Sequence, residues 1–229
     1  MLRCSTVLAA LVVAAALLVA APGGAQNVRR DDLRQGVSEK TPAPELFLRA
    51  YEVFSHPRCA NCHPRDDRPR WGERSEHIHG MNVQRGVERS HSEENRFAGG
   101  YGRPGETCPT CHQQENGKLA GSPPGSAHWR LAPLRMGWVG LTAAELCEQF
   151  KKLAQDNGRE EINRVIEHIV EPDDKDRWER EHGRKWEIDP LVKWAWEPWP
   201  GHQRPPGELE QLVQVLTWWK NAGADCPSK

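Results

Sequence analysis

Two short cysteine–histidine motifs constrain this chain more than any other feature. They are Cys59-Ala60-Asn61-Cys62-His63 and Cys108-Pro109-Thr110-Cys111-His112, and each has the pattern C-x-x-C-H, at which a c-type haem is attached. Two residues between the thiols let both sulfurs reach the two vinyl-derived carbons on one porphyrin edge. The next histidine then lies under the iron as the proximal axial ligand. The sequence therefore predicts two covalently bound c-type haems, with thioether bonds at the four cysteines and with His63 and His112 as proximal ligands of iron.

Zinc binding and thiol–disulfide chemistry are the alternative interpretations of these cysteines. Two C-x-x-C knuckles that share one zinc are usually separated by about 15–20 residues, whereas this chain runs from Cys62 to Cys108 between them. Zinc also gives no reason for a histidine at the same offset after both knuckles. A thioredoxin-type motif needs a βαβ context, and no such pattern surrounds either site. Haem attachment is the interpretation that these observations favour.

Residues 1–25 are expected to be an export signal. Arg3 precedes an Ala-, Val- and Leu-rich run at 7–21, and small residues at 23–25 suit cleavage. The run is shorter than the ~20 residues of a membrane-spanning helix, so we expect no stable membrane span after cleavage, with an uncleaved anchor as the alternative. Because c-type haem is attached outside the cytoplasm in bacteria, a periplasmic location agrees with the haem prediction.

Three cysteines lie outside the two motifs. Cys4 would be lost with the signal, which leaves Cys147 and Cys226. In an oxidising compartment two remaining thiols most simply form a disulfide. Two independent buried thiols are the alternative.

The sequence predicts a mostly α fold, and its composition indicates that the haems are part of the core. Hydrophobic residues make up only 37% of the chain, and covalently held porphyrins would supply the missing apolar centre. We expect a single compact cytochrome c-like helical domain, with long loops around two covalently attached haems. The net charge of −1 suggests neither a nucleic-acid nor an anionic membrane partner.

Helical periodicity and end signals occur in four segments, and no strands are expected. The predicted helices cover 44–55, 142–158, 159–171 and 208–222. Residues 26–41 are expected to be a flexible lead-in, residues 42–229 the dihaem domain, and 171–189 a charged insertion within it. The segments 64–107 and 113–140 are expected to be loops.

The distal ligands of the two irons are predicted from position in the chain. For the first haem, His79 is the first candidate and Met81 the second. For the second haem, Met136 is first, then His168, while His128 lies in the same loop as Met136. Each of these side chains could instead be an ordinary solvated or boundary residue. Four other histidines are expected to be ordinary polar residues: His56, His91, His182 and His202.

Beyond the motifs, the chain resembles bacterial dihaem proteins described as isoquinoline 1-oxidoreductase subunit-like. The resemblance includes the run 56–64, the segment 83–86, Trp129-Arg130-Leu131-Ala132-Pro133, Trp194-Ala195-Trp196 and the C-terminal 222–227. It departs at 88–105 and at 171–189. The resemblance implies an electron-transfer role beside a dehydrogenase, although nothing in this chain could bind molybdopterin.

These observations favour a periplasmic electron carrier, or the cytochrome subunit of a dehydrogenase, whose partners are periplasmic redox proteins. Such a protein binds and tunes its cofactors and needs no separate catalytic residues, so we expect no enzyme activity of its own. The main alternative is a haem peroxidase or reductase with one five-coordinate iron. A haem-based sensor or an assembly factor is a third interpretation.

Overall fold

A computed structural model of the protein describes residues 31–72, 74–80, 83–86, 100–119, 122–127, 129–156, 166, 168–170, 175–183, 185–197 and 203–229. The helices in this part of the chain are α1 (Ala43–Phe54), α2 (Pro57–Ala60), α3 (Ala143–Asp156), α5 (Lys175–His182), α6 (Pro190–Trp196) and α7 (Leu209–Asn221), with 3₁₀ turns η2 (Cys108–Thr110) and η3 (Leu134–Met136). The strands are β1 (Arg70–Trp71), β2 (His77–Ile78), β3 (Gly102–Arg103) and β4 (Glu106–Thr107).

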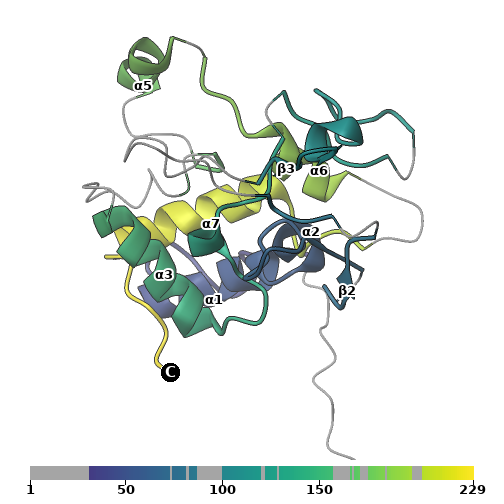
Figure 1. Cartoon of the computed structure of the whole chain (residues 1–229). Coiled ribbons are helices and arrows are strands. Elements are labelled where there is room, and N and C mark those ends of the chain that lie inside the picture. Colours follow the sequence, from purple (N-terminus) through teal and green to yellow (C-terminus); the bar gives the residue numbers. More distant parts are fainter. Residues whose placement is uncertain are drawn as a thin grey trace, which may run out of the picture.

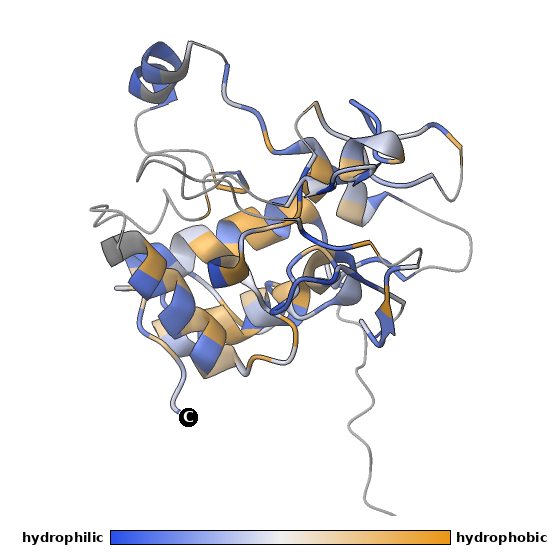
Figure 2. Ribbon diagram, viewed as in Figure 1, coloured by the Kyte–Doolittle hydropathy of each residue, from blue (hydrophilic) through white to orange (hydrophobic). Residues whose placement is uncertain are grey.

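Helices α1, α3 and α7 pack together and form the main apolar core (Figure 1). The apolar colour in Figure 2 gathers on α1 and α7, which contact each other along their length. Phe47 in α1 lies between two aromatic rings, those of Phe150 in α3 and Trp219 in α7, at centroid distances of 6.1 Å and 4.9 Å. Burial of these large side chains is the main source of stability for the three helices.

Two of the predicted helices begin with reciprocal caps. At the start of α3, the backbone N–H of Thr142 donates to the Glu145 carboxylate at 2.8 Å, and the N–H of Glu145 donates to the Thr142 hydroxyl at 3.3 Å. Glu208 and Gln211 form the corresponding capping box at α7. Because the first amides of a helix have no partner within it, these caps fix where α3 and α7 start.

The structure contains a disulfide between Cys147 and Cys226, with an S–S distance of 2.07 Å. Cys147 lies in α3 and is fully buried, and Cys226 follows α7. The bond therefore ties the C-terminal segment to the helical core, as the sequence predicted.

Between the helices, the chain forms two small antiparallel hairpins. Arg70 pairs with Ile78 in the first and Gly102 with Thr107 in the second. No strand was expected here, and the difference has a simple cause. Strands of two residues are too short to produce a period-2 hydrophobic pattern.

The described part of the segment expected to be a flexible lead-in contacts the helical core. Residues 31–41 form turns, and the side chain of Leu33 is fully buried in the main core. The backbone N–H of Leu33 also donates to the Gln211 side chain at 3.2 Å. Leu33 and Val37 are the two apolar residues of this polar stretch and both contact the main core. Two residues are too few to establish a helical period, so their burial could not be predicted.

Three further segments can be compared with the expected elements. The helix expected at 159–171 lies mostly outside the described residues. The charged insertion contains α5, which lies at the upper left of Figure 1, away from α1 and α2. The short helix α6, which was not expected, begins at Pro190 and is capped by the Asp189 side chain. No helix among the described residues is long and apolar enough to cross a membrane.

Candidate haem sites

Both C-x-x-C-H motifs fold as a single helical turn. In the first, His56 caps α2, and the backbone N–H of Cys62 donates to the carbonyl of Cys59 at 3.3 Å. In the second, Cys111 donates in the same way to Cys108 at 3.2 Å. A helical turn places residues three apart on the same face, so each pair of thiols is presented on one side of its turn. This is the arrangement that attachment to one porphyrin edge requires.

The imidazole of His63 is held by a tryptophan and by a backbone carbonyl. Its ring stacks on the indole of Trp138, with 3.4 Å between centroids and 10° between planes. Its Nδ1 lies 2.8 Å from the carbonyl oxygen of Met136. Since a carbonyl only accepts, Nδ1 carries the proton and the lone pair is on Nε2, the nitrogen that would bind iron.

His112 is held in the same way by different residues. Its ring stacks on Trp129, with 3.6 Å between centroids and 15° between planes, and its Nδ1 lies 2.7 Å from the carbonyl oxygen of Pro124. A hydrogen bond from Nδ1 to a carbonyl fixes the tautomer and the orientation of a histidine that binds metal through Nε2. Both motif histidines therefore present a neutral Nε2 before any metal is bound.

A single segment, residues 129–139, contacts both motifs. Its first residue, Trp129, stacks on His112, and near its end Trp138 stacks on His63. Between them, the backbone N–H of Ala132 donates to the carbonyl of Cys62 at 3.2 Å. The expected loop at 113–140 is thus a structural bridge between the two motifs.

Burial shifts the pKa values of the motif side chains toward their neutral forms. It raises the pKa of the Cys59 thiol to about 12 and that of Cys62 to about 11, and it also raises the pKa of Cys108. Protonated thiols are poor nucleophiles and poor zinc ligands. Burial also lowers the pKa of His63 to about 3 and lowers the pKa of His112.

Arg85 connects the surroundings of both motifs. It is a charged side chain of the core, with only 2% of its surface exposed. Its guanidinium donates to the carbonyl of Ala132 and, at 3.4 Å, to that of Asp66. Burial lowers the pKa of His63 and the charge of Arg85 adds to this, whereas at Cys108 the same charge opposes the increase in pKa that burial causes. The burial of Arg85 could not be predicted from the sequence, because an arginine in a polar loop carries no signal of burial.

The side chains around both motifs fit a haem. The indole N–H groups of Trp129 and Trp138 are buried and have no hydrogen-bond partner among the described residues. A buried donor without an acceptor costs about 1–3 kcal/mol. Haem brings two carboxylates, the kind of acceptor that such donors lack. Among the described residues, no group of three or more His, Cys, Asp or Glu is placed to hold a metal ion by itself.

The candidate distal ligands fall in different places. Met136 lies at the first motif, where its carbonyl accepts the hydrogen bond from His63, although its position in the chain suggested the second haem. His79 and His168 are described and are partly buried. Met81 and His128 lie outside the described residues.

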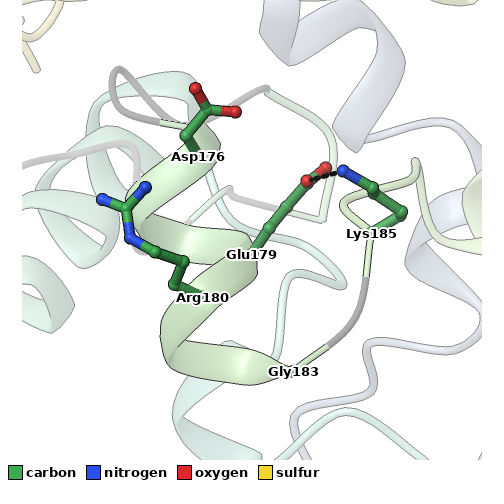
Figure 3. A pocket seen from close by; sticks show the side chains of 5 residues that line it. All are labelled: Asp176, Glu179, Arg180, Gly183 and Lys185. Atoms are coloured by element: carbon green, nitrogen blue, oxygen red, sulfur yellow. Dashed lines mark hydrogen bonds and ion pairs between the residues drawn. The ribbon is translucent and has the colours of Figure 1, made fainter.

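A pocket elsewhere in the structure holds none of the predicted residues (Figure 3). It is lined by charged side chains of α5 and by Gly183, and Glu179 and Lys185 form an ion pair of 2.5 Å at its edge. That hydrogen bond lowers the pKa of the Glu179 carboxyl. The lining of the pocket contains no histidine or cysteine, so the pocket holds none of the residue types that the predicted function uses.

Comparisons of the chain with models of known protein families, with curated proteins and with solved structures found no match.

Proposed function

We propose that the protein is a dihaem c-type cytochrome that transfers electrons. One haem would be bound through Cys59 and Cys62 with His63 as proximal ligand of iron, and the other through Cys108 and Cys111 with His112. The haem iron supplies the one-electron redox chemistry, and the chain's work is to bind, orient and shield it.

The main observation behind this proposal is that both motif histidines are oriented, and hold a free Nε2 lone pair, without any metal bound. Each imidazole is stacked on a tryptophan and donates from Nδ1 to a backbone carbonyl, which leaves Nε2 as a lone-pair donor. The carbonyl and the indole that hold His63 belong to other residues than those that hold His112. Because two different sets of residues orient the two imidazoles in the same way, we infer that both histidines serve the same chemistry.

Electron transfer is favoured over catalysis by the supply of histidines near both motifs. A six-coordinate iron exchanges electrons without binding substrate, whereas an enzyme needs an open position. The structure describes His79 and His168 as partly buried side chains in addition to the proximal pair. We therefore propose a carrier whose partners are other redox proteins. A periplasmic location and a dehydrogenase as partner follow only from the expected export signal and the resemblance given above.

Carbon monoxide distinguishes the carrier from an enzyme. The protein would be produced with its leader in a host that attaches c-type haem, reduced with dithionite and exposed to the gas. A carrier with two six-coordinate haems gives low-spin spectra that the gas leaves unchanged. A high-spin component that binds carbon monoxide or reacts with peroxide would instead indicate an enzyme with one five-coordinate haem.

A further inference from the structure

A chain of backbone hydrogen bonds begins at the first C-x-x-C-H motif. The N–H of Ala132 donates to the carbonyl of Cys62 at 3.2 Å. The residue before it, Leu131, donates from its own N–H to the carbonyl of Gly100 at 3.0 Å. Two neighbouring amides of one segment therefore bind the first motif and Gly100, respectively.

The same chain of hydrogen bonds ends at the second motif. Tyr101, which follows Gly100, accepts at its carbonyl from the N–H of Cys108 at 2.9 Å. The Cys108 thiol also lies 3.3 Å from the carbonyl oxygen of Gly100. Three backbone hydrogen bonds and two peptide bonds thus join Cys62 to Cys108, and we call residues 100–101 and 131–132 the inter-motif bridge.

Much of the inter-motif bridge is shielded from water. Gly100 and Leu131 are buried, and Leu131 packs in a small core cluster with Cys108 and Trp129. The buried guanidinium of Arg85 donates to the bridge at the carbonyl of Ala132. Fixed dipoles in surroundings without water reorganise little when a charge moves near them. Such surroundings favour rapid electron transfer.

A close approach at Gly100 sets the length of the bridge. Gly100 has a φ of +86°, and a Cβ atom there would lie 2.6 Å from the carbonyl oxygen of Leu131. Glycine accepts both this left-handed backbone and this contact. Gly105, in the turn between β3 and β4, has nearly the same φ of +85°, but a Cβ atom there would meet nothing within 4 Å. The two glycines therefore separate the effect of backbone conformation from the effect of close approach.

We propose that the two haems exchange electrons within the molecule across the inter-motif bridge. In each step one electron leaves the ferrous iron held by one motif, which becomes ferric, and reduces the ferric iron held by the other. Electron tunnelling is faster through covalent and hydrogen-bonded atoms than across gaps, and the bridge joins a cysteine of one attachment site to a cysteine of the other. This inference rests on the proposed function, since both haems must first be attached.

The rate of internal electron exchange tests the bridge. In the holoprotein, a flash-generated reductant adds less than one electron per molecule, and electron paramagnetic resonance of rapidly frozen samples identifies the haem that is still ferric. Redistribution between the haems should be first-order, with a rate that does not depend on protein concentration. If the two reduction potentials are too close for redistribution to be seen, exchange between the haem methyl proton resonances of the half-reduced protein gives the same rate.

Two variants lengthen or interrupt the bridge. Gly100→Ala should push its two parts away from each other and lower the exchange rate several-fold, whereas Gly105→Ala, the matched control, should leave the rate unchanged. Ala132→Pro removes the N–H that donates to Cys62. Because a residue before a proline is extended, the backbone ahead of Pro133 suits this substitution. Ala132→Pro should also lower the rate several-fold.

Spectra and potentials separate loss of the bridge from damage to a haem. Gly100→Ala and Ala132→Pro should both keep two low-spin haems and the reduction potentials of the unchanged protein, so that the driving force for exchange is the same. A merely structural role of these residues would not slow exchange under these conditions. A rate that falls only as far as a changed potential difference requires would contradict the inference.

The result can contradict the inference without contradicting the function. A rate proportional to protein concentration would show that electrons pass between molecules, and a first-order rate that neither variant changes would show another route between the haems. Either result would overturn the bridge and leave the dihaem cytochrome intact. A protein that attaches no haem at either motif would overturn the proposed function itself.

Discussion

Trp138 contacts His63 through both its backbone and its side chain. The backbone N–H of Trp138 donates to the carbonyl of His63 at 2.7 Å, and the two rings stack with 3.4 Å between their centroids. The indole also packs on Phe54 and Phe150 in the core, at 5.2 Å and 5.7 Å. Trp138 therefore couples the orientation of one predicted iron ligand to the packing of the helices.

Replacing Trp138 by alanine should destabilise the protein and disturb one haem. Loss of a buried tryptophan costs about 3–5 kcal/mol, to be measured by urea unfolding. The paramagnetically shifted proton resonances of the haem held by His63 should move, because its imidazole would lose its stacking partner. Trp129→Ala is the reciprocal variant and should move those of the haem held by His112. If each variant shifted the resonances of both haems equally, the idea that each indole orients only one histidine would be contradicted.

Replacing Gly137 should affect only the first haem, and replacing Gly125 should affect only the second. A Cβ on Gly137 would lie 2.8 Å from the carbonyl oxygen of Pro64 and would push the segment that carries Trp138 away from the first motif. A Cβ on Gly125 would overlap the Glu115 carbonyl and displace Pro124 from His112. Gly137→Ala should therefore shift the reduction potential of the first haem and Gly125→Ala that of the second, each serving as the control for the other in a potentiometric titration. A shift at the wrong haem would show that the assignment of these contacts is mistaken.

Arg85 should influence both haems at once. Arg85→Met removes a buried positive charge near both motifs, and a nearby positive charge stabilises the reduced form of an iron centre. Both reduction potentials should fall, by tens of millivolts. Because two carbonyls would lose their hydrogen-bond donor, the free energy of unfolding should also fall by about 2–4 kcal/mol. Arg74→Met is the control, because Arg74 is exposed and the substitution removes the same charge. It should leave the two reduction potentials and the free energy of unfolding close to those of the unchanged protein. A potential that changes at one haem only would contradict the shared position of Arg85.

The disulfide should contribute to stability without affecting haem attachment. Cys147 and Cys226 are separated by 79 residues, and closing a loop of this size stabilises a fold by about 4 kcal/mol. The double variant Cys147→Ala, Cys226→Ala should lose about that much in urea unfolding and retain both haems. Loss of haem in this variant would mean that the bond is needed for attachment rather than for stability alone.

Helices and caps were predictable from the sequence because their signals are local. The periodicity of α1 and the pair Thr142 and Glu145 each lie within one short window. The tryptophans and carbonyls that hold the motif histidines were not predictable, because these contacts join residues that are distant in the chain. His63 and Trp138 are far apart in the chain, and nothing near Trp138 signals that it would contact a histidine. Arg85 and Leu33 were missed for the same reason.

Distal ligation shows the limit of sequence order most clearly. Order along the chain associates His79 with the preceding motif and Met136 with the following one. The structure instead places the carbonyl of Met136 at the first motif, where it accepts from His63. The family resemblance, which no comparison supported, remains an expectation about partners.

The intact mass of the exported protein tests the central claim most directly. Purified from a host that attaches c-type haem and then denatured, the chain should carry two haem-sized mass increments that survive acid–acetone extraction. The variant with Cys59→Ser and Cys62→Ser, and the variant with Cys108→Ser and Cys111→Ser, should each retain one. A colourless protein with the mass of the bare polypeptide, made beside a control cytochrome that is fully loaded, would contradict the account.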